Sequence, residues 1–184
     1  MDATYKIEFF SNWHCGSGLA AGADVDALVV KDQQGLPYVP GRTLKGLLRE
    51  AATELTEDPR IVNKIFGIPG DKSKGEQSTR VACAFFGNAT LREGDAIVSQ
   101  KLTPYLFQTF ASTAIDDNGI AKDNSLRKIE TVVPCTLTGT ILNVPNEGMD
   151  LLEKSMAYIK RMGTGRTRGY GRCKIEITKW EETK

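Results

Sequence analysis

The sequence predicts an α+β fold in which an antiparallel sheet is backed by two helices and interrupted by a protruding insertion. Strand-like and helix-like patterns alternate along the chain in the order β, β, α, β, insertion, β, α, β, which is typical of this class. Two stretches repeat apolar residues at the i, i+3, i+4 spacing of a helix that buries one face. A third, long stretch is polar and rich in turn residues, and it predicts the insertion.

The first half of the chain supplies two short strands and the clearest helix. Residues 5–10 and the apolar run 27–30 predict strands, with a glycine-rich loop at 11–26 between them. Over 44–55, leucines and alanines recur on one helical face, and Thr43 is the expected N-cap. We therefore expect this helix to pack its apolar side against the sheet.

The second half repeats this alternation around the insertion. The proline-rich and charged stretch 57–80 predicts an irregular connection, and the apolar run 81–86 predicts a buried strand. The polar insertion covers 93–131. The remaining expected elements are a strand at 132–143, a helix at 149–162 and a last strand at 173–180. This order is compatible with a ferredoxin-like, or RRM-like, fold.

Length and composition favour one globular domain over residues 1–184, with 93–131 inserted in it. With 184 residues, 40% of them hydrophobic, the chain can bury a substantial core. No charged-then-apolar leader opens it, and no apolar run approaches the ~20 residues that span a bilayer, so we expect a cytoplasmic protein without membrane contact. Four scattered cysteines and one histidine disfavour a zinc site.

A glycine-rich basic segment at 163–171 is the strongest functional signal. Glycines let the backbone approach a ligand closely, arginines donate to phosphate oxygens, and an aromatic ring can stack on a base. Seven basic residues and no acid lie between Glu153 and Glu176, although the net charge of the chain is only +1. A local basic stripe of this kind indicates one RNA-binding face, with a solvated hairpin loop as the alternative. The residues expected to bind RNA here are Gly163, Gly165, Arg166, Arg168, Gly169, Tyr170 and Arg172.

The start of the first helix is a second candidate for phosphate binding. Gly41, Arg42 and Lys45 cluster where the helix dipole is positive, so a phosphate could dock there. The chain has no Walker A pattern, and Arg168 occupies the place of the third glycine of a dinucleotide-binding fingerprint. These absences disfavour a nucleotide-dependent metabolic enzyme.

Three separated segments resemble one family, the RAMP superfamily (repeat-associated mysterious proteins). Residues 37–49 match its pattern Pro-x-(Ile/Val)-Pro-Gly-x-(Ser/Thr)-(Leu/Ile)-Lys-Gly-x-x-Arg, and 163–171 resembles its C-terminal glycine-rich loop. Residues 114–130 are similar to the "thumb" hairpin of type III backbone subunits. The segments occur in the family's order and together cover most of the chain.

The resemblance implies a backbone subunit of a type III CRISPR effector complex. Such a subunit binds guide RNA, contacts copies of itself head to tail in a helical filament, and pushes its thumb between guide and target RNA. Other effector subunits would complete the assembly. Relatives of this kind carry an aspartate, in the loop before the second strand, that is needed for metal-dependent cleavage of target RNA.

Asp26 is the position that best matches this catalytic aspartate, because it directly precedes the apolar run 27–30. Asp24 is the fallback. A carboxylate can hold a hydrated Mg²⁺ or another divalent cation, or it can orient the 2′-hydroxyl nucleophile. One carboxylate makes a weak metal site, so we expect metal to bind only together with target RNA. The alternative is that both aspartates are turn residues bonded to nearby amides.

Two further functional hypotheses remain open. An imidazole can act as a general base near neutral pH, so the single histidine, His14, is the candidate base of a metal-independent endonuclease that processes guide RNA. Alternatively, the chain only coats guide RNA and its aspartates are structural. The expectation that the chain is an endoribonuclease therefore depends on the resemblance to the family and not on composition.

Three more basic residues are expected to contact RNA. Lys45 and Arg49 lie on the first helix, and Arg127 lies in the thumb. For Arg49 and Arg127 the alternative is a surface ion pair with a nearby glutamate, for which the candidates are Glu50, Glu54 and Glu130.

Overall fold

The protein is built on an antiparallel sheet whose two central strands lie far apart in the sequence. The computed structural model describes residues 1–22, 24–68, 81–91 and 101–183. Strand β1 (Asp2–Phe9) lies between β6 (Thr136–Leu142) and the edge strand β7 (Cys173–Glu181). The short strands β2 (Phe85–Phe86) and β3 (Thr90–Leu91) both pair with the other side of β6. All these pairs are antiparallel.

Alternation in β1 separates the two faces of the sheet. Ala3, Tyr5, Ile7 and Phe9 are buried, whereas the residues between them are half-buried on the opposite face. Successive strand residues point to opposite faces, so the apolar half of β1 turns toward the helices and forms the centre of the core.

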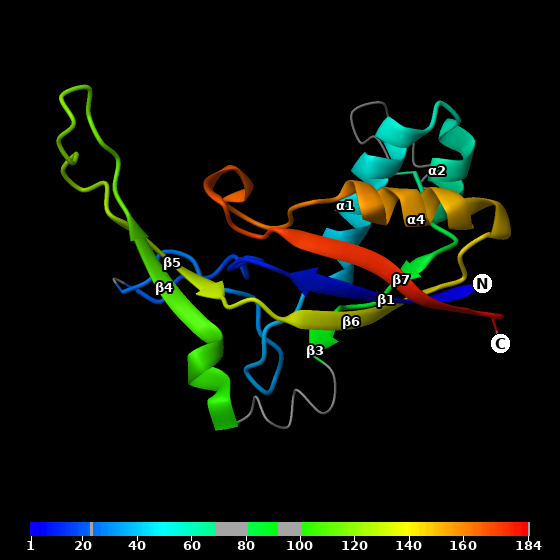
Figure 1. Ribbon diagram of the computed structural model, residues 1–184, viewed down its shortest axis with the longest axis horizontal. Helices are drawn as coiled ribbons and strands as arrows, with labels where there is room; N and C mark the ends of the chain where they lie inside the picture. The colour runs from blue at the N-terminus through cyan, green and yellow to red at the C-terminus, as the bar shows by residue number, and fades with distance from the viewer. Residues whose placement is uncertain (23, 69–80, 92–100, 184) are drawn as a thin grey trace.

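The helices cover one face of the sheet (Figure 1). Helix α1 (Gly41–Leu55) contacts α4 (Met149–Tyr158), and α4 contacts β7. Each of these two helices lies in a β-α-β connection that passes over one strand of the sheet. Helix α1 lies between β1 and β2, which flank β6, and helix α4 lies between β6 and β7, which flank β1. The predicted antiparallel sheet backed by two helices is confirmed, and the ferredoxin-like subclass stays a prediction.

A third helix, α2 (Pro59–Phe66), lies in the stretch that we expected to be irregular. That expectation is wrong for 59–66, because proline is well suited to the first turn of a helix. The Asp58 side chain accepts a hydrogen bond from the Arg60 N–H, which caps the helix. The rest of the stretch, 69–80, lies outside the described residues.

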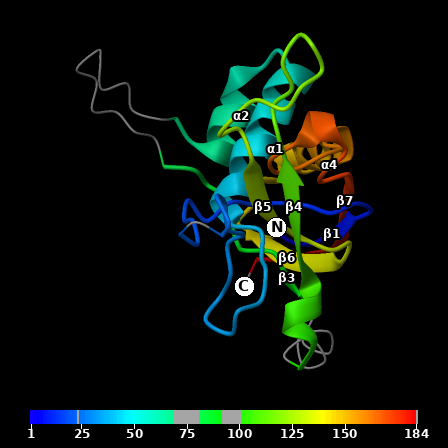
Figure 2. The same cartoon turned by 90° about the vertical axis from the view of Figure 1, so that its left-hand side faces the viewer.

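The insertion forms a hairpin that projects from one end of the sheet. Strands β4 (Phe107–Ser112) and β5 (Arg127–Val132) pair antiparallel, after a short 3₁₀ turn at Thr103–Leu106. Figure 1 shows the hairpin at the end of the molecule away from both chain termini, and Figure 2 views the molecule from that end. Most of the predicted insertion therefore forms this hairpin, while 93–100 lie outside the described residues.

The start of α1 differs from the expectation that Thr43 is its N-cap. The helix begins at Gly41 after Pro40, and the Thr43 N–H donates to the Pro40 carbonyl. The Asn88 side-chain oxygen accepts from the Gly41 N–H at 2.9 Å, which satisfies a helix-start donor from a distant segment. A Cβ at Gly41 would lie 2.0 Å from the Phe86 carbonyl oxygen, so the backbone contact requires glycine.

Four other predicted elements also change. Residues 27–30 make isolated bridges instead of a regular strand, and only the last two residues of 81–86 are in a strand. The predicted strand 132–143 is split between β5 and β6, because Pro134 between them has no N–H to donate to a sheet. Helix α4 ends at Tyr158, since 160–162 pair with 171–173.

Within the described residues, no helix is long and apolar enough to cross a membrane.

Candidate nucleic-acid interface

The segment 163–171, called the glycine loop below, has a backbone that only glycine can form at its two ends. A Cβ at Gly163 would lie 2.3 Å from the His14 carbonyl oxygen, and one at Gly171 would lie 1.8 Å from the Met162 carbonyl oxygen. Both residues also have positive φ angles, of 89° and 67°. The glycines therefore let the loop press against neighbouring backbone, with a short 3₁₀ turn at Arg166–Arg168 as its outer part.

Main-chain hydrogen bonds fasten the glycine loop to the segment that follows β1. The Thr164 N–H donates to the His14 carbonyl at 2.9 Å, and the Gly171 N–H donates to the Asn12 carbonyl at 2.7 Å. The Arg172 N–H donates to the Ser11 hydroxyl oxygen at 3.0 Å. The sequence predicted two separate loops, and the structure shows one joined scaffold.

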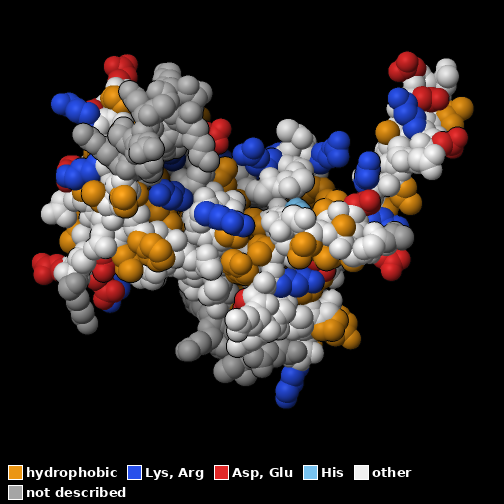
Figure 3. Space-filling view, turned by 180° about the vertical axis from the view of Figure 1, so that it is seen from behind, with side chains coloured by type: hydrophobic (Ala, Val, Ile, Leu, Met, Phe, Trp, Pro, Cys, Tyr) orange, Lys and Arg blue, Asp and Glu red, His pale blue; other side chains and the backbone are white. Residues whose placement is uncertain are grey.

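The arginines of this scaffold are exposed and lack acidic partners among the described residues. No described carboxylate is within ion-pair distance of Arg166, Arg168 or Arg172. Arg161, which precedes the loop, donates to the Arg166 carbonyl. Figure 3 shows Lys and Arg side chains spread over the face that the helices, the loop and the base of the hairpin share. This arrangement leaves the guanidinium groups available to an anionic ligand.

The glycine loop also touches the hairpin. The Tyr170 ring meets the Phe110 ring of β4 edge to face, with centroids 5.6 Å apart and planes at 67°. An aromatic pair of this geometry is favourable. The loop is therefore held between the segment after β1 and the hairpin.

The start of α1 is a weaker phosphate site than the sequence suggested. The Asn88 side chain already accepts from Gly41, and Thr43 bonds to Pro40, so two early N–H groups are engaged. A groove of about 380 Å³ joins Arg161 and Arg166 to the middle and second half of α1, where Glu50 and Glu54 line it. Those carboxylates oppose a phosphate. The glycine loop thus borders acidic residues of α1, and no continuous basic surface among the described residues of this groove joins it to the start of the helix.

Lys45 and Arg49 remain available for binding. Both are half-buried on α1, and neither forms an ion pair with a described carboxylate, Glu50 and Glu54 included. The ion-pair alternative for Arg49 is therefore not observed among the described residues.

Asp26 lies beside the start of β5, at the end of the β4–β5 ladder next to the hairpin tip, and is partly engaged. Its Oδ2 accepts from the Lys128 N–H at 2.7 Å, and its own N–H donates to the Lys128 carbonyl at 2.8 Å. Its Oδ1 lies 3.6 Å from Nη1 of Arg127, with 44% of the Asp26 side chain and 70% of the Arg127 side chain exposed. Arg127 therefore pairs with Asp26 and not with Glu130. Asp24 is exposed nearby in the same loop.

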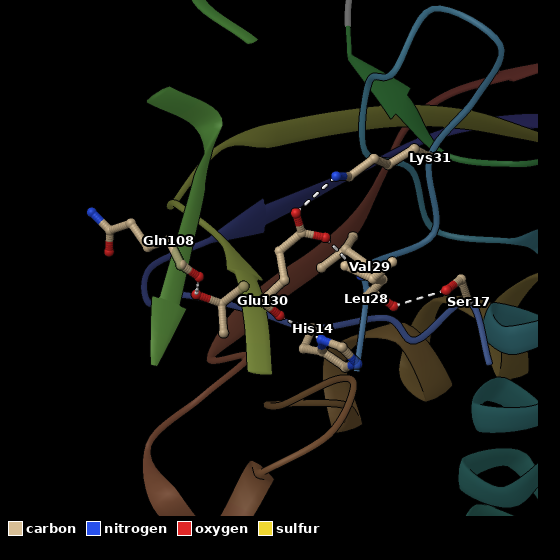
Figure 4. Close-up of polar contacts among 8 residues, drawn as sticks. His14, Ser17, Leu28, Val29, Lys31, Gln108 and Glu130 are labelled. Carbon is tan, nitrogen blue, oxygen red and sulfur yellow. Dashed lines mark hydrogen bonds and ion pairs between the residues drawn. The ribbon is translucent and has the colours of Figure 1, made fainter. Parts of the chain in front are cut away.

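Glu130, which sequence reasoning considered only as an ion-pair partner, joins three segments at this site (Figure 4). Its carboxylate accepts from the Val29 N–H at 3.0 Å and from Nζ of Lys31 at 2.8 Å. Its carbonyl accepts from Nδ1 of His14 at 2.6 Å. The carboxylate thereby holds 27–31 against β5. No sequence pattern marks this role, because the contacts span about a hundred residues of chain.

His14 does not fit the general-base hypothesis. Its side chain is only 3% exposed, and its Nδ1 must carry the proton that the Glu130 carbonyl accepts. Its backbone carbonyl accepts from the glycine loop. Through its imidazole and its backbone carbonyl, His14 thus links β5 to the glycine loop, which is a structural role.

The described residues do not form a ready-made metal site. No group of three or more His, Cys, Asp or Glu side chains among them could hold an ion. Mg²⁺ requires near-octahedral oxygen coordination, and Asp26 offers one carboxylate with one oxygen already bonded to an N–H. The described protein residues alone fit a resident magnesium ion poorly.

Comparisons with known proteins point in one direction. The family model described as the RAMP superfamily matches residues 6–174. A chain of type III-B Cmr-beta in the apo state is 13% identical, covers 97% of this chain and 98% of its own length, and has a TM-score of 0.71. A chain of type III-B Cmr-beta bound to cognate target RNA is 11% identical, with coverage of 96% and 97% and a TM-score of 0.72. Identities this low show a shared fold. No curated protein matches.

Proposed function

Because this chain belongs to the RAMP superfamily, we propose that it is a backbone subunit of a type III CRISPR effector complex that binds guide RNA and cleaves bound target RNA. Copies of the chain would follow one another along the guide in a helical filament, together with other effector subunits, in the cytoplasm. The fold shared with Cmr-beta chains over nearly their whole length supports this role.

The observation that carries the RNA-binding part is a set of arginines, without described acidic partners, on a fixed backbone. Arg166 and Arg168 of the glycine loop and Arg172 directly after it are exposed, and this segment is bonded to neighbouring main chain and to the Ser11 hydroxyl. A guanidinium group binds a phosphate through two parallel hydrogen bonds, and a preordered loop loses little conformational entropy when it does so.

Substituting Arg166→Ala together with Arg168→Ala tests this part. Each phosphate contact on single-stranded RNA contributes roughly 0.7 to the slope of log Kd against log salt concentration, so the double variant should bind guide RNA more weakly with a slope flatter by about 1.4. Fluorescence anisotropy at several salt concentrations measures both quantities. Lys154→Ala, which removes a lysine already paired with Asp150, is the matched control. A double variant with the wild-type slope would exclude these arginines from the interface.

The cleavage part rests on the position of Asp26. The Lys128 N–H fixes the orientation of its carboxylate at the start of β5, next to the hairpin tip, and leaves Oδ1 facing Arg127. When RNA phosphate binds, it competes for Arg127 and frees that oxygen. A divalent cation held by Asp26, phosphate oxygens and water would neutralise charge on the phosphate that is cleaved.

The same contacts support the non-catalytic alternative. Asp26 accepts one backbone N–H and pairs with one arginine, as a structural aspartate does. In that case the chain coats guide RNA, and its aspartates only stabilise the hairpin.

Asp26→Asn and Asp24→Asn in the assembled complex with Mg²⁺ separate the two possibilities. Asparagine keeps a side-chain oxygen for the Lys128 N–H, so Asp26→Asn should preserve folding and guide binding while target cleavage falls by at least about a hundredfold. Gel analysis of labelled target RNA measures cleavage, and thermal unfolding checks the fold. Unchanged cutting in both variants would exclude both aspartates and support the coating role, whereas loss of cutting only in Asp24→Asn would move the catalytic assignment to Asp24.

A further inference from the structure

Phe10 is an exposed aromatic residue with no role so far. It directly follows β1, in the bend after the strand end, and its side chain lines a groove together with residues of α4 and β7. Its side chain is 48% exposed. The Phe10 N–H donates to the Arg172 carbonyl at 2.8 Å, so the ring stands at the stem of the glycine loop.

Cations surround Phe10 more than acids do. The Arg172 guanidinium lies 5.9 Å from the ring centroid, and Lys160 and Arg161 line the same groove. None of these three has a described carboxylate as an ion-pair partner. They leave the groove positively charged near the ring.

The acids that line this groove are already engaged. Glu153 accepts from the Trp180 indole N–H at 2.7 Å. Glu176 pairs with Lys174 and Lys6, whose hydrogen bonds lower its pKa to about 2. An entering phosphate therefore meets three cations that have no described acidic partner, while both lining carboxylates already have a donor of their own.

The groove is large enough for a nucleotide and is continuous with the glycine loop. Its volume is about 790 Å³, and its lining combines Phe10 with apolar residues of α4 and β7. It shares Ile159, Lys160 and Arg161 with the smaller groove that Arg166 borders. Lys160 and Arg161, which line both grooves, therefore connect Arg166 to Phe10, while Glu50 and Glu54 line only the smaller groove.

We propose that Phe10 is a base-stacking subsite, at which one base of an RNA strand held by the glycine loop stacks on the ring while Arg172 binds the adjoining phosphate. This inference rests on the proposed RNA-binding function and extends it to residues outside the glycine loop. An exposed ring beside available cations suits single-stranded nucleic acid, because every base has a stacking face and stacking tolerates any sequence.

The test compares Phe10 variants of the full chain on two probes. The first probe is a short, end-labelled, single-stranded oligoadenylate, and the second is the same ribose-phosphate chain with its bases removed. Phe10→Ala should weaken binding of the oligoadenylate by about 5- to 100-fold without changing the salt slope, because it removes stacking and no charge. The abasic chain should bind both proteins equally. Phe10→Trp should retain affinity, and its added indole emission should be quenched by the oligoadenylate.

Phe85→Ala is the matched control, since Phe85 is an exposed phenylalanine on the opposite edge of the sheet and 63% of it is accessible. It should bind both probes like the wild type. If Phe10→Ala binds the oligoadenylate with wild-type affinity, the subsite is wrong. It is also wrong if Phe10→Ala binds the abasic chain as weakly as the oligoadenylate, because that result indicates altered folding or a lost phosphate contact.

The arginine double variant separates failure of the subsite from failure of the proposed function. If Phe10→Ala binds normally while Arg166→Ala with Arg168→Ala binds weakly, the subsite is wrong and the proposed function stands. If none of these variants affects RNA, the proposed function fails as well. If Phe10→Ala weakens the binding of poly-glutamate and leaves the binding of RNA unchanged, the groove binds an acidic protein segment and the inference is overturned.

Discussion

Single residues at this interface divide into those that hold the backbone and those that remain available to a ligand. Gly163, Gly171, Glu130 and His14 make their close contacts within the protein. The arginines at 166, 168 and 172, in the glycine loop and directly after it, are exposed, with no described carboxylate paired to them. The first group explains why the second group is held at fixed positions.

Gly171 and Gly169 differ in the space around a Cβ atom, and this difference predicts how alanine at each position changes stability. Gly171→Ala should lower the free energy of unfolding by roughly 2–4 kcal/mol, because its Cβ would collide with the Met162 carbonyl and its φ of 67° is strained for alanine. Gly169 has a φ of 90°, but a Cβ there would meet nothing within 4 Å, so Gly169→Ala should cost only about 1 kcal/mol. Urea unfolding of both variants measures the difference. Equal costs would show that the close approach at Gly171 relaxes.

Residue types at the site were predictable from the sequence, but their pairings were not. Repeated glycines and arginines with no nearby acid identified the glycine loop, and the match to a known motif identified Asp26 as a candidate. The hydrogen bonds of Glu130 to Val29 and Lys31 could not be predicted, because they join segments about a hundred residues apart. Burial of His14 follows from the same distant packing.

At the scale of elements, amphipathic patterns were reliable where the element packs along its whole length. The apolar stripe of α1 and the alternation in β1 both match the structure. Prediction failed for 27–30, where an apolar run forms only bridges because a glutamate side chain takes one of its N–H groups. It also failed for α2, because proline and charge at a helix start resemble those of a loop.

The hairpin β4–β5 is attached at its base and independent at its tip. Trp13 pairs with Val132, and Lys31 binds Glu130 and lies 4.0 Å from the Phe107 ring centroid. The hydrogen bonds of the tip, such as the Asp116 side chain accepting from the N–H groups at 118 and 120, stay within the tip. The base therefore belongs to the domain, and the tip is free to engage another molecule.

Shortening the tip tests this division. Replacing residues 113–126 by an Asn-Gly turn should leave the thermal unfolding midpoint within about 3 °C of the wild type, because the described hydrogen bonds of the tip lie within it. Target cleavage in the assembled complex should fall if the tip positions RNA. Phe107→Ala, which removes a half-buried ring at the base, is the contrasting variant and should lower the midpoint clearly. A large loss of stability in the shortened protein would contradict an independent tip.

On the scale of the whole molecule, two buried thiols of the core should lower the stability of the fold at alkaline pH. Burial raises the pKa of the Cys15 thiol from 9.0 to about 12 and that of Cys173 from 9.0 to about 11. Between pH 9 and these values the unfolded chain loses the two protons and the folded chain keeps them.

Stability should therefore be complete below pH 9 and decline as the pH rises from 9 toward 11. Urea midpoints across this range measure the decline, and Cys15→Ala with Cys173→Ala should make it shallower. A decline of the same steepness in the double variant would assign the effect to other groups.

The main-chain anchoring of the glycine loop has one more consequence. Since the bonds from Thr164, Gly171 and Arg172 to the segment after β1 use the N–H groups of the loop, the side chains at 166–168 can be exchanged without altering its course. The loop is thus a natural place for evolution, or for an engineer, to retune affinity while the architecture stays constant.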